Sequence, residues 1–205
     1  SCAAKEQASV KEQRIVVFDL GGGSCDVSIV EAADNATTVL STYGDTGLGG
    51  NDFREALVDH VVNAFVTETG VDLQKQFDAM PRVRQACELA KCNLSYASET
   101  VVEVPFVAGD DGCPLHMRVT VSRDAYEKKI ERLVDRCLLN IEKALQGAAL
   151  NKDDIDGILL VGGSTQTPRI REMIRLKFGK EPYAGINPLE AVAIGAAVQG
   201  GILAG

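Results

Sequence analysis

The stretch FDLGGGSCDVSIV, residues 18–30, places three consecutive glycines between two apolar runs. A second glycine segment, LLVGGSTQTP, occupies residues 159–168 and also follows a short apolar run. Glycine permits positive φ and leaves no Cβ between the backbone and a ligand, so backbone N–H groups at such strand ends can close on a phosphate or a ribose. One such loop is a weak signal, but two of them predict a nucleotide held between the loops.

Composition and charge narrow the class of protein. With 205 residues, 45 % of them hydrophobic, the chain can bury a core in one large domain or two small ones. The net charge of −8 argues against a broad surface for nucleic acid or an anionic membrane. No apolar run reaches the length of a membrane span, and no signal peptide precedes the first predicted strand. We therefore expect no nucleic-acid partner and no membrane partner.

The chain contains six cysteines: Cys2, Cys25, Cys87, Cys92, Cys113 and Cys137. Their spacing includes no CxxC pair, and a chain of this length needs no disulfide framework. The two histidines lie far apart without a cysteine or carboxylate cluster, which argues against a zinc site. We predict reduced thiols, with Cys137 as a small core residue, and a cytoplasmic location.

Three β-runs at 14–20, 26–31 and 37–43 are separated by short turns and predict an antiparallel meander. GDTGLGGNDF, residues 44–53, then opens a helix that Asn51 or Asp52 would cap and Gly70 would end.

The next predicted elements are a helix from Pro81 to about residue 95 and a hairpin of 100–108 and 115–121 that turns at GDDG. A helix over 123–146, a strand over 157–161 and a helix from Pro168 follow. The last predicted helix starts at Asn187-Pro188-Leu189-Glu190. The body of the last helix, AVAIGAAVQGGILAG, is apolar all round, so we expect it to be buried and tightly packed. This pattern predicts an α/β core from residues 14–52 and 117–205, an inserted α+β unit over 53–116, and a connecting segment over 1–13.

The first glycine loop has the residues for phosphate and metal chemistry. Asp19 could hold Mg²⁺ through water while the N–H groups of the three glycines face phosphate oxygens, and Ser24 adds a hydroxyl. Walker A is excluded because no Gly-Lys-Ser/Thr follows. A nucleophile elbow is excluded because Asp26 stands at the second glycine position and a strand follows. The residues alone leave open that this segment is only a tight hairpin turn.

The second loop, Gly162-Gly163-Ser164-Thr165, precedes Pro168 and a helix, whose first N–H groups favour an anionic or polar ligand group. Taken alone, this segment could equally be an ordinary strand-to-helix connection.

In the inserted unit, Glu88, Lys91, Cys92 and Ser95 fall at i, i+3, i+4 and i+7, on one face of one helix. Taken alone, this pattern favours a solvated Glu–Lys pair that contributes a few tenths of a kcal/mol.

Five segments together resemble, in family order, the signatures of the 70-kDa heat-shock chaperones: DLGGGSCDVSI, GDTGLGGNDF, ACELAKCNLS, LVGGSTQTPRI and INPLEAVAIGAAVQGGIL. The resemblance runs from about residue 14 to 205. It implies an α/β fold, the actin-like ATPase (ribonuclease H-like) lobe with an inserted α+β subdomain, as the second lobe of the nucleotide-binding domain. The first lobe, the peptide-binding domain and its lid would be separate from this sequence.

The resemblance also implies roles for named residues, with ATP or ADP and Mg²⁺ as cofactors. The β- and γ-phosphates would be contacted by Gly21, Gly22, Gly23 and Ser24, and the catalytic residues near Mg²⁺ and the attacking water would be Asp19 and Asp26. Ribose and adenine would be bound by Glu88, Lys91 and Ser95. The α-phosphate and nucleoside would be covered by Gly162, Gly163 and Ser164. Implied partners are the first lobe and the peptide-binding domain of the same protein, a J-domain co-chaperone, unfolded peptide clients, and a nucleotide-exchange factor that grips the inserted subdomain.

Three residues depart from the family pattern at the nucleoside end. Cys92 and Gln166 stand where the family has two arginines that sandwich adenine, and Leu189 replaces an aspartate. Each lost cation–π contact would weaken nucleotide binding by roughly 0.5–2 kcal/mol. Ser24-Cys25 in place of Thr-Phe is a milder change.

These departures leave two hypotheses. The parent protein is an ATP-driven chaperone whose second lobe alone has little ATPase activity, or it is a regulatory or exchange-factor-like relative with weakened nucleotide binding. A metabolic kinase is disfavoured because no sugar-binding constellation accompanies the chaperone-type DTGLGGNDF segment.

Overall fold

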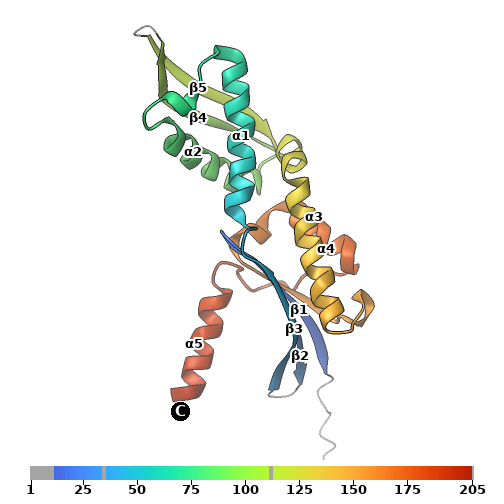
Figure 1. The fold of residues 1–205 in the computed structure, drawn as a ribbon. Helices are drawn as coiled ribbons and strands as arrows, with labels where there is room; N and C mark the ends of the chain where they lie inside the picture. Colours follow the sequence, from blue (N-terminus) through green and yellow to red (C-terminus); the bar gives the residue numbers. More distant parts are fainter. Residues whose placement is uncertain (1–11, 34–35, 111–112, 205) are drawn as a thin grey trace, which may run out of the picture.

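The computed structural model describes residues 12–33, 36–110 and 113–204, and it is a mixed α/β fold. One sheet has the order β3-β2-β1-β6, with β1 Gln13–Leu20, β2 Cys25–Ala33, β3 Ala36–Asp45 and β6 Gly157–Val161 (Figure 1). The first three strands are antiparallel, so the predicted meander is confirmed. β6 runs parallel to β1, with Asp19 opposite Val161. Both glycine loops therefore leave the sheet at the same end of the strands, which is called the glycine-loop edge below.

Two helices belong to this sheet (Figure 1). α3, Arg123–Gly147, packs against β2 and β3, and α4, Pro168–Phe178, packs against α3. The Ser122 hydroxyl caps α3 by accepting from the Ala125 N–H at 3.2 Å. The apolar side chains of α3 face inward, where Ile130, Cys137 and Ile141 are completely buried. Two short 3₁₀ turns, Lys152–Asp154 and Gly163–Gln166, flank β6.

A second group of elements lies beyond the glycine-loop edge of the sheet (Figure 1). It consists of α1 Gly50–Thr69, the 3₁₀ turn Leu73–Lys75, α2 Ala79–Leu94, and the antiparallel pair β4 Glu99–Asp110 and β5 Cys113–Ser122. α2 packs on β4, and α1 packs on α2 and α3. Phe53, Leu57, Val61 and Phe65 recur every four residues along α1 and are buried, and Gly70 ends the helix at φ 73°, as predicted. The hairpin is longer than predicted, because Gly109 and Asp110 pair with β5 instead of forming the turn.

The start of α1 differs from the prediction. Neither Asn51 nor Asp52 is the cap residue, because Gly49 takes that position and the helix begins at Gly50. Asp52 instead occupies the third helical position, where its carboxylate accepts from the Gly49 N–H at 2.8 Å. A carboxylate there satisfies an unpaired N–H at the helix start, as in a capping box.

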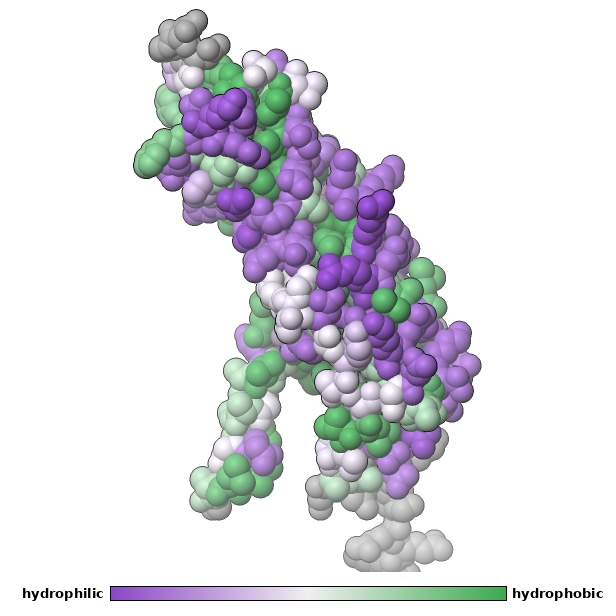
Figure 2. Space-filling view, in the orientation of Figure 1, coloured by the Kyte–Doolittle hydropathy of each residue, from purple (hydrophilic) through white to green (hydrophobic). Residues whose placement is uncertain are grey.

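The last helix, α5 Ala191–Ala204, contradicts the expectation of tight packing. It starts after a turn in which the Asn187 carbonyl accepts from the N–H groups of Glu190 and Ala191, both at 3.0 Å. Every residue from 192 to 204 is exposed, and the helix extends away from the sheet as a largely green and white rod (Figures 1 and 2). No described segment of this chain covers its apolar side chains, which is why the expected burial is absent.

Four cysteines are described as free thiols. Cys137 is completely buried, as predicted, and so is Cys25. Cys2 and the side chain of Cys113 lie outside the described residues. Within residues 12–33, 36–110 and 113–204, no helix combines the length and apolar character needed to cross a membrane.

Candidate functional site

Three glycine-bearing segments are hydrogen-bonded to one another at the edge of the sheet. The Gly21 carbonyl accepts from the Gly50 N–H at 2.9 Å and from the Ser164 hydroxyl at 3.0 Å. The Gly22 carbonyl accepts from the Asn51 N–H at 2.8 Å. The two loops predicted to share a ligand therefore touch directly, and the start of α1 is bound to the first of them.

Close backbone approach explains two of the glycines. A Cβ on Gly49 would lie 2.6 Å from the carbonyl carbon and oxygen of Gly22 and from the Gly23 nitrogen. A Cβ on Gly162, which has φ 84°, would lie 2.3 Å from the Leu20 carbonyl oxygen. Both contacts are with backbone atoms, which cannot move aside as a flexible side chain can. The junction is therefore closed to any larger residue at these two positions.

The loop N–H groups divide into occupied and available donors. The Gly21 N–H donates to the Ser24 carbonyl at 3.0 Å, so the expectation that it faces a phosphate is wrong and it closes the turn between β1 and β2 instead. The Gly162 N–H likewise donates to the Pro188 carbonyl at 2.9 Å. Within the part of the chain that the structure describes, the N–H groups of Gly22 and Gly23 donate to no protein acceptor. The first loop therefore forms the turn of a hairpin and still leaves two N–H groups that can donate to an anion.

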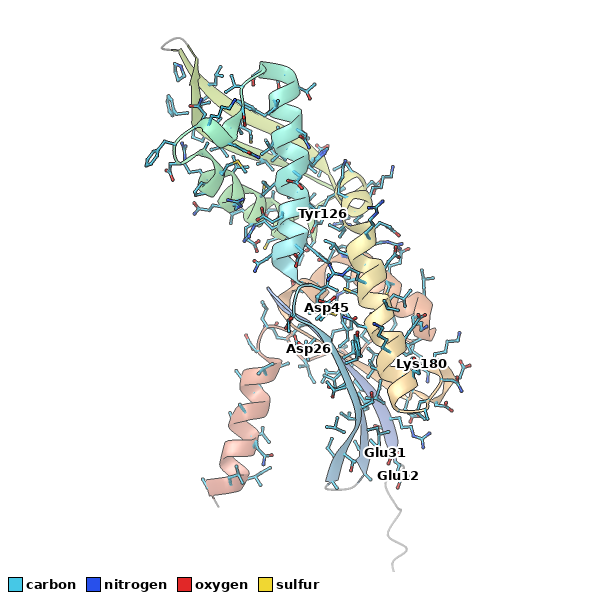
Figure 3. The ribbon with its side chains drawn as sticks, viewed as in Figure 1. Glu12, Asp26, Glu31, Asp45, Tyr126 and Lys180 are labelled. Atoms are coloured by element: carbon cyan, nitrogen blue, oxygen red, sulfur yellow. The ribbon has the colours of Figure 1, made fainter. Side chains whose placement is uncertain are left out.

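Two carboxylates lie opposite each other where β1 and β2 meet this loop. Asp19 pairs with Asp26 in the strand register, and Figure 3 shows Asp26 at the end of the sheet that faces α1. The Ser24 hydroxyl donates to the Asp26 carboxylate at 2.8 Å. Burial, and then the negative charge of Asp26, raise the pKa of Asp19 above its ordinary value.

No basic side chain among the described residues forms an ion pair with either of these carboxylates. Two carboxylates without a basic partner fit a hard divalent cation such as Mg²⁺.

The predicted face of α2 turns toward the glycine junction. Lys91 pairs with Glu88 at 3.0 Å, as the spacing indicated. The same ammonium also donates to the Gly50 carbonyl at 3.1 Å, and the Lys91 side chain is only 13 % exposed. A solvated surface pair is therefore the wrong description, because Lys91 ties α2 to the start of α1.

These segments enclose a cavity of about 390 Å³, large enough for a nucleoside or a small nucleotide. The predicted residues that line it are Gly21, Gly22, Glu88, Lys91, Ser95, Gly163 and Ser164. The predicted residues that lie outside the lining are Asp19, Gly23, Ser24, Asp26 and Gly162. The site thus separates into a pocket and an adjoining carboxylate pair.

All three departures from the family pattern line this cavity: Cys92, Gln166 and Leu189. Cys92 contacts the Glu88 carboxylate, with its sulfur 3.8 Å from Oε1. Burial and that carboxylate raise the pKa of the Cys92 thiol, which keeps it neutral. Cys92, Gln166 and Leu189 therefore contribute uncharged groups to the lining of this cavity.

Four lining residues escaped the sequence analysis: Gly50, Asn51, Tyr96 and Thr167. Two of them carried a usable signal. Gly50 belongs to a glycine pair directly before a helix, which is typical of close backbone approach. Tyr96 lies at i+8 from Glu88, so it continues the i, i+3, i+4, i+7 face that had already been singled out.

Two glycine loops at the ends of adjacent parallel strands, with free backbone donors and a helix-lined cavity, define a class: an α/β protein with a site suited to a phosphorylated ligand. The family model described as Hsp70 protein matches residues 3–205 of this chain. The chain belongs to the Hsp70 family, and the match is consistent with part of a chaperone nucleotide-binding domain, a domain that binds ATP or ADP in this family.

Proposed function

We propose that this chain is the second lobe of an Hsp70-type nucleotide-binding domain and holds ATP or ADP between its two glycine loops. The observation that carries the proposal is the meeting of three segments, at Gly21, Gly50 and Ser164, beside the Lys91 face of α2. The N–H groups of Gly22 and Gly23 would hold phosphate oxygens. Glu88, Lys91 and Ser95 would bind the ribose and base, with Gly163 and Ser164 over the α-phosphate.

Mg²⁺ fits the carboxylate pair beside the first loop. Asp19 and Asp26 would hold it through water, because they face each other without a basic partner among the described residues. The ion would screen the charge that accumulates on the phosphates.

The proposed domain organisation is an actin-like core with an inserted α+β subdomain, as the sequence predicts. β5 pairs with β4 from Cys113 to Ser122, with a register shift between Val104 and Ala108. This pairing supports a second boundary of the inserted unit nearer to Ser122 than to residue 117. α1, α2 and the β4–β5 pair would be the part that a nucleotide-exchange factor grips.

Exposed α5 supports a partner for this lobe. Val192, Val198 and Ile202 are 60–68 % exposed, and an apolar helix of this kind needs a cover in water. The first lobe of the same protein would supply that cover, together with the remaining phosphate contacts. We therefore expect the isolated chain to hydrolyse ATP poorly, and ATP-driven binding of unfolded peptide, with a J-domain co-chaperone, to require the full protein.

The test is a calorimetric titration of the 205-residue chain with Mg-ADP. We expect saturable binding that Lys91→Ala weakens by about tenfold, because a charged hydrogen-bond donor is lost from the cavity. Lys177→Ala is the matched control, since Lys177 is also a mostly buried lysine paired with a glutamate, Glu142 at 2.9 Å, but it does not line the cavity.

Absence of binding at millimolar ADP, or equal loss in the two lysine variants, would refute the nucleotide site. Vigorous ATP turnover by the chain alone, abolished by Asp19→Asn, would refute the dependence on a first lobe.

A further inference from the structure

Tyr96 and Gln166 form a bridge at the mouth of the cavity. Tyr96 follows the end of α2, and its hydroxyl donates to the side-chain carbonyl of Gln166 in the second glycine loop. The two residues are 70 positions apart in the sequence, so the bridge links the α2 group of elements to the sheet.

The bridge is also the wall between two hollows. Tyr96 and Gln166 line both the 390 Å³ cavity and a second hollow of about 350 Å³ on its other side, next to Arg171 and Arg175 of α4. A ligand in the first cavity can therefore contact this pair.

The wall suits a flat, uncharged ring. Among the described residues, Glu88 and Lys91 are the only charged ones that line the cavity, and they neutralise each other at 3.0 Å. Tyr96 is the only aromatic residue that the described part of the chain contributes to the lining, and it is 78 % exposed, so most of its surface is available to a ligand. An exposed aromatic ring beside a phosphate-binding loop offers a stacking surface to a nucleobase.

We propose that Tyr96 is the base-stacking residue of this site and that Gln166 positions it by holding its hydroxyl. The inference rests on the proposed nucleotide site and adds its specificity. The ring would replace the cationic sandwich with a single aromatic surface, which favours purines over pyrimidines because purines stack over a larger area. The phosphate end takes no part in this selection.

The experiment compares Tyr96→Ala and Tyr96→Phe with the unchanged 205-residue chain, by calorimetric titration with Mg-ADP, Mg-CDP and Mg-pyrophosphate. Tyr96→Ala should weaken ADP binding by about tenfold, the loss typical of removing one base–aromatic stack, and weaken CDP binding less. Tyr96→Phe keeps the ring and loses only the bridge, so its ADP affinity should fall by less than about threefold. Pyrophosphate affinity should be the same in all three proteins.

Phe77→Ala is the matched control, because Phe77 is an aromatic residue that is 99 % exposed and lies outside the cavity. Proton NMR supplies an independent measurement: ADP, but not pyrophosphate, should shift the ring resonances that Tyr96→Phe alters.

The outcomes separate the two levels of the proposal. If Tyr96→Ala binds ADP as tightly as the unchanged chain, the stacking role is wrong and the nucleotide site stands. If Tyr96→Ala weakens pyrophosphate as much as ADP, the residue acts through the fold, and the stacking role is again wrong. If the unchanged chain binds neither ADP nor pyrophosphate, the proposed function itself fails.

Discussion

The two ends of the cavity differ in whether backbone atoms or side chains form them. At the proposed phosphate end, backbone segments contact one another: Gly49 lies against Gly22, and the Gly21 carbonyl accepts from both Gly50 and Ser164. At the nucleoside end, the lining consists of side chains such as Cys92, Tyr96 and Gln166. The first end has no room for variation, whereas the second has an exposed tyrosine and no cationic clamp.

This difference shows which part of a binding site can diverge. A glycine with backbone atoms at 2.6 Å from its Cβ position cannot be replaced without moving a strand end or a helix start. A side chain at the open end such as Leu189, which is 67 % exposed, can change without moving backbone atoms. Cys92, Gln166 and Leu189 line this open end, so we expect their substitution to change the affinity for the base more than the affinity for phosphate.

The largest expected effect breaks the rigid end. Gly49→Ala should lower the free energy of unfolding by about 2–3 kcal/mol, because the added methyl group overlaps the Gly22 backbone. For a chain of this size that corresponds to a Tm decrease of roughly 4–12 °C, measurable by circular dichroism. Gly23→Ala is the matched control, since no atom lies within 4 Å of its Cβ position and its stability should be unchanged. Equal losses in the two variants would show that the junction is not tightly packed.

Much of this junction could be predicted from the sequence. Apolar runs before Gly21 and Gly162 placed both loops at strand ends, and the parallel pairing of β1 and β6 brings those ends together. The sequence could not show that the Gly21 and Gly162 N–H groups are occupied, because their acceptors, Ser24 and Pro188, depend on the turn geometry. The role of Gly49 was also missed, since close approach depends on a second segment that lies far away in the sequence.

The second-largest expected effect tests the side-chain end of the cavity, which contains Cys92 and Gln166. The double substitution Cys92→Arg/Gln166→Arg should tighten Mg-ADP binding by about tenfold, because two guanidinium groups would then flank the base. Calorimetry measures the change, and pyrophosphate affinity should stay constant because the glycines of both loops are unchanged. Unchanged ADP affinity would show that the base does not lie between residues 92 and 166.

The last helix shows that a sequence can predict an apolar surface without identifying the partner that covers it. The composition of AVAIGAAVQGGILAG predicts a helix with a strong tendency to be buried. The helix is present as α5, and Val192 and Ile194 both belong to it. Those side chains are 65 % and 51 % exposed. Hydrophobicity predicts that a surface needs cover, but it does not identify the molecule that provides it.

The smallest expected effect tests whether charge also holds the rigid end together. Asp45 is the last residue of β3 and lies shortly before Gly49 in the chain. Its carboxylate accepts from Arg136 of α3 at 2.7 Å and from the Gly47 N–H at 2.9 Å. These contacts hold the pKa of Asp45 below its ordinary value, first through the hydrogen bond from Arg136 and then through the backbone N–H of Gly47.

Because the folded-state pKa is lowered, the pair stabilises the fold above the unfolded-state pKa of about 4 and loses its contribution as the pH falls through the folded-state value. Asp45→Asn should therefore cost at most about 1 kcal/mol at pH 7, since the pair is partly exposed and screened, and less at pH 3. Urea unfolding at both pH values measures the difference, with Glu103→Gln as the control for a fully solvated pair, Arg118–Glu103 at 3.5 Å. A loss at pH 7 as large as that of Gly49→Ala would mean that electrostatics, and not backbone packing, fixes the phosphate end.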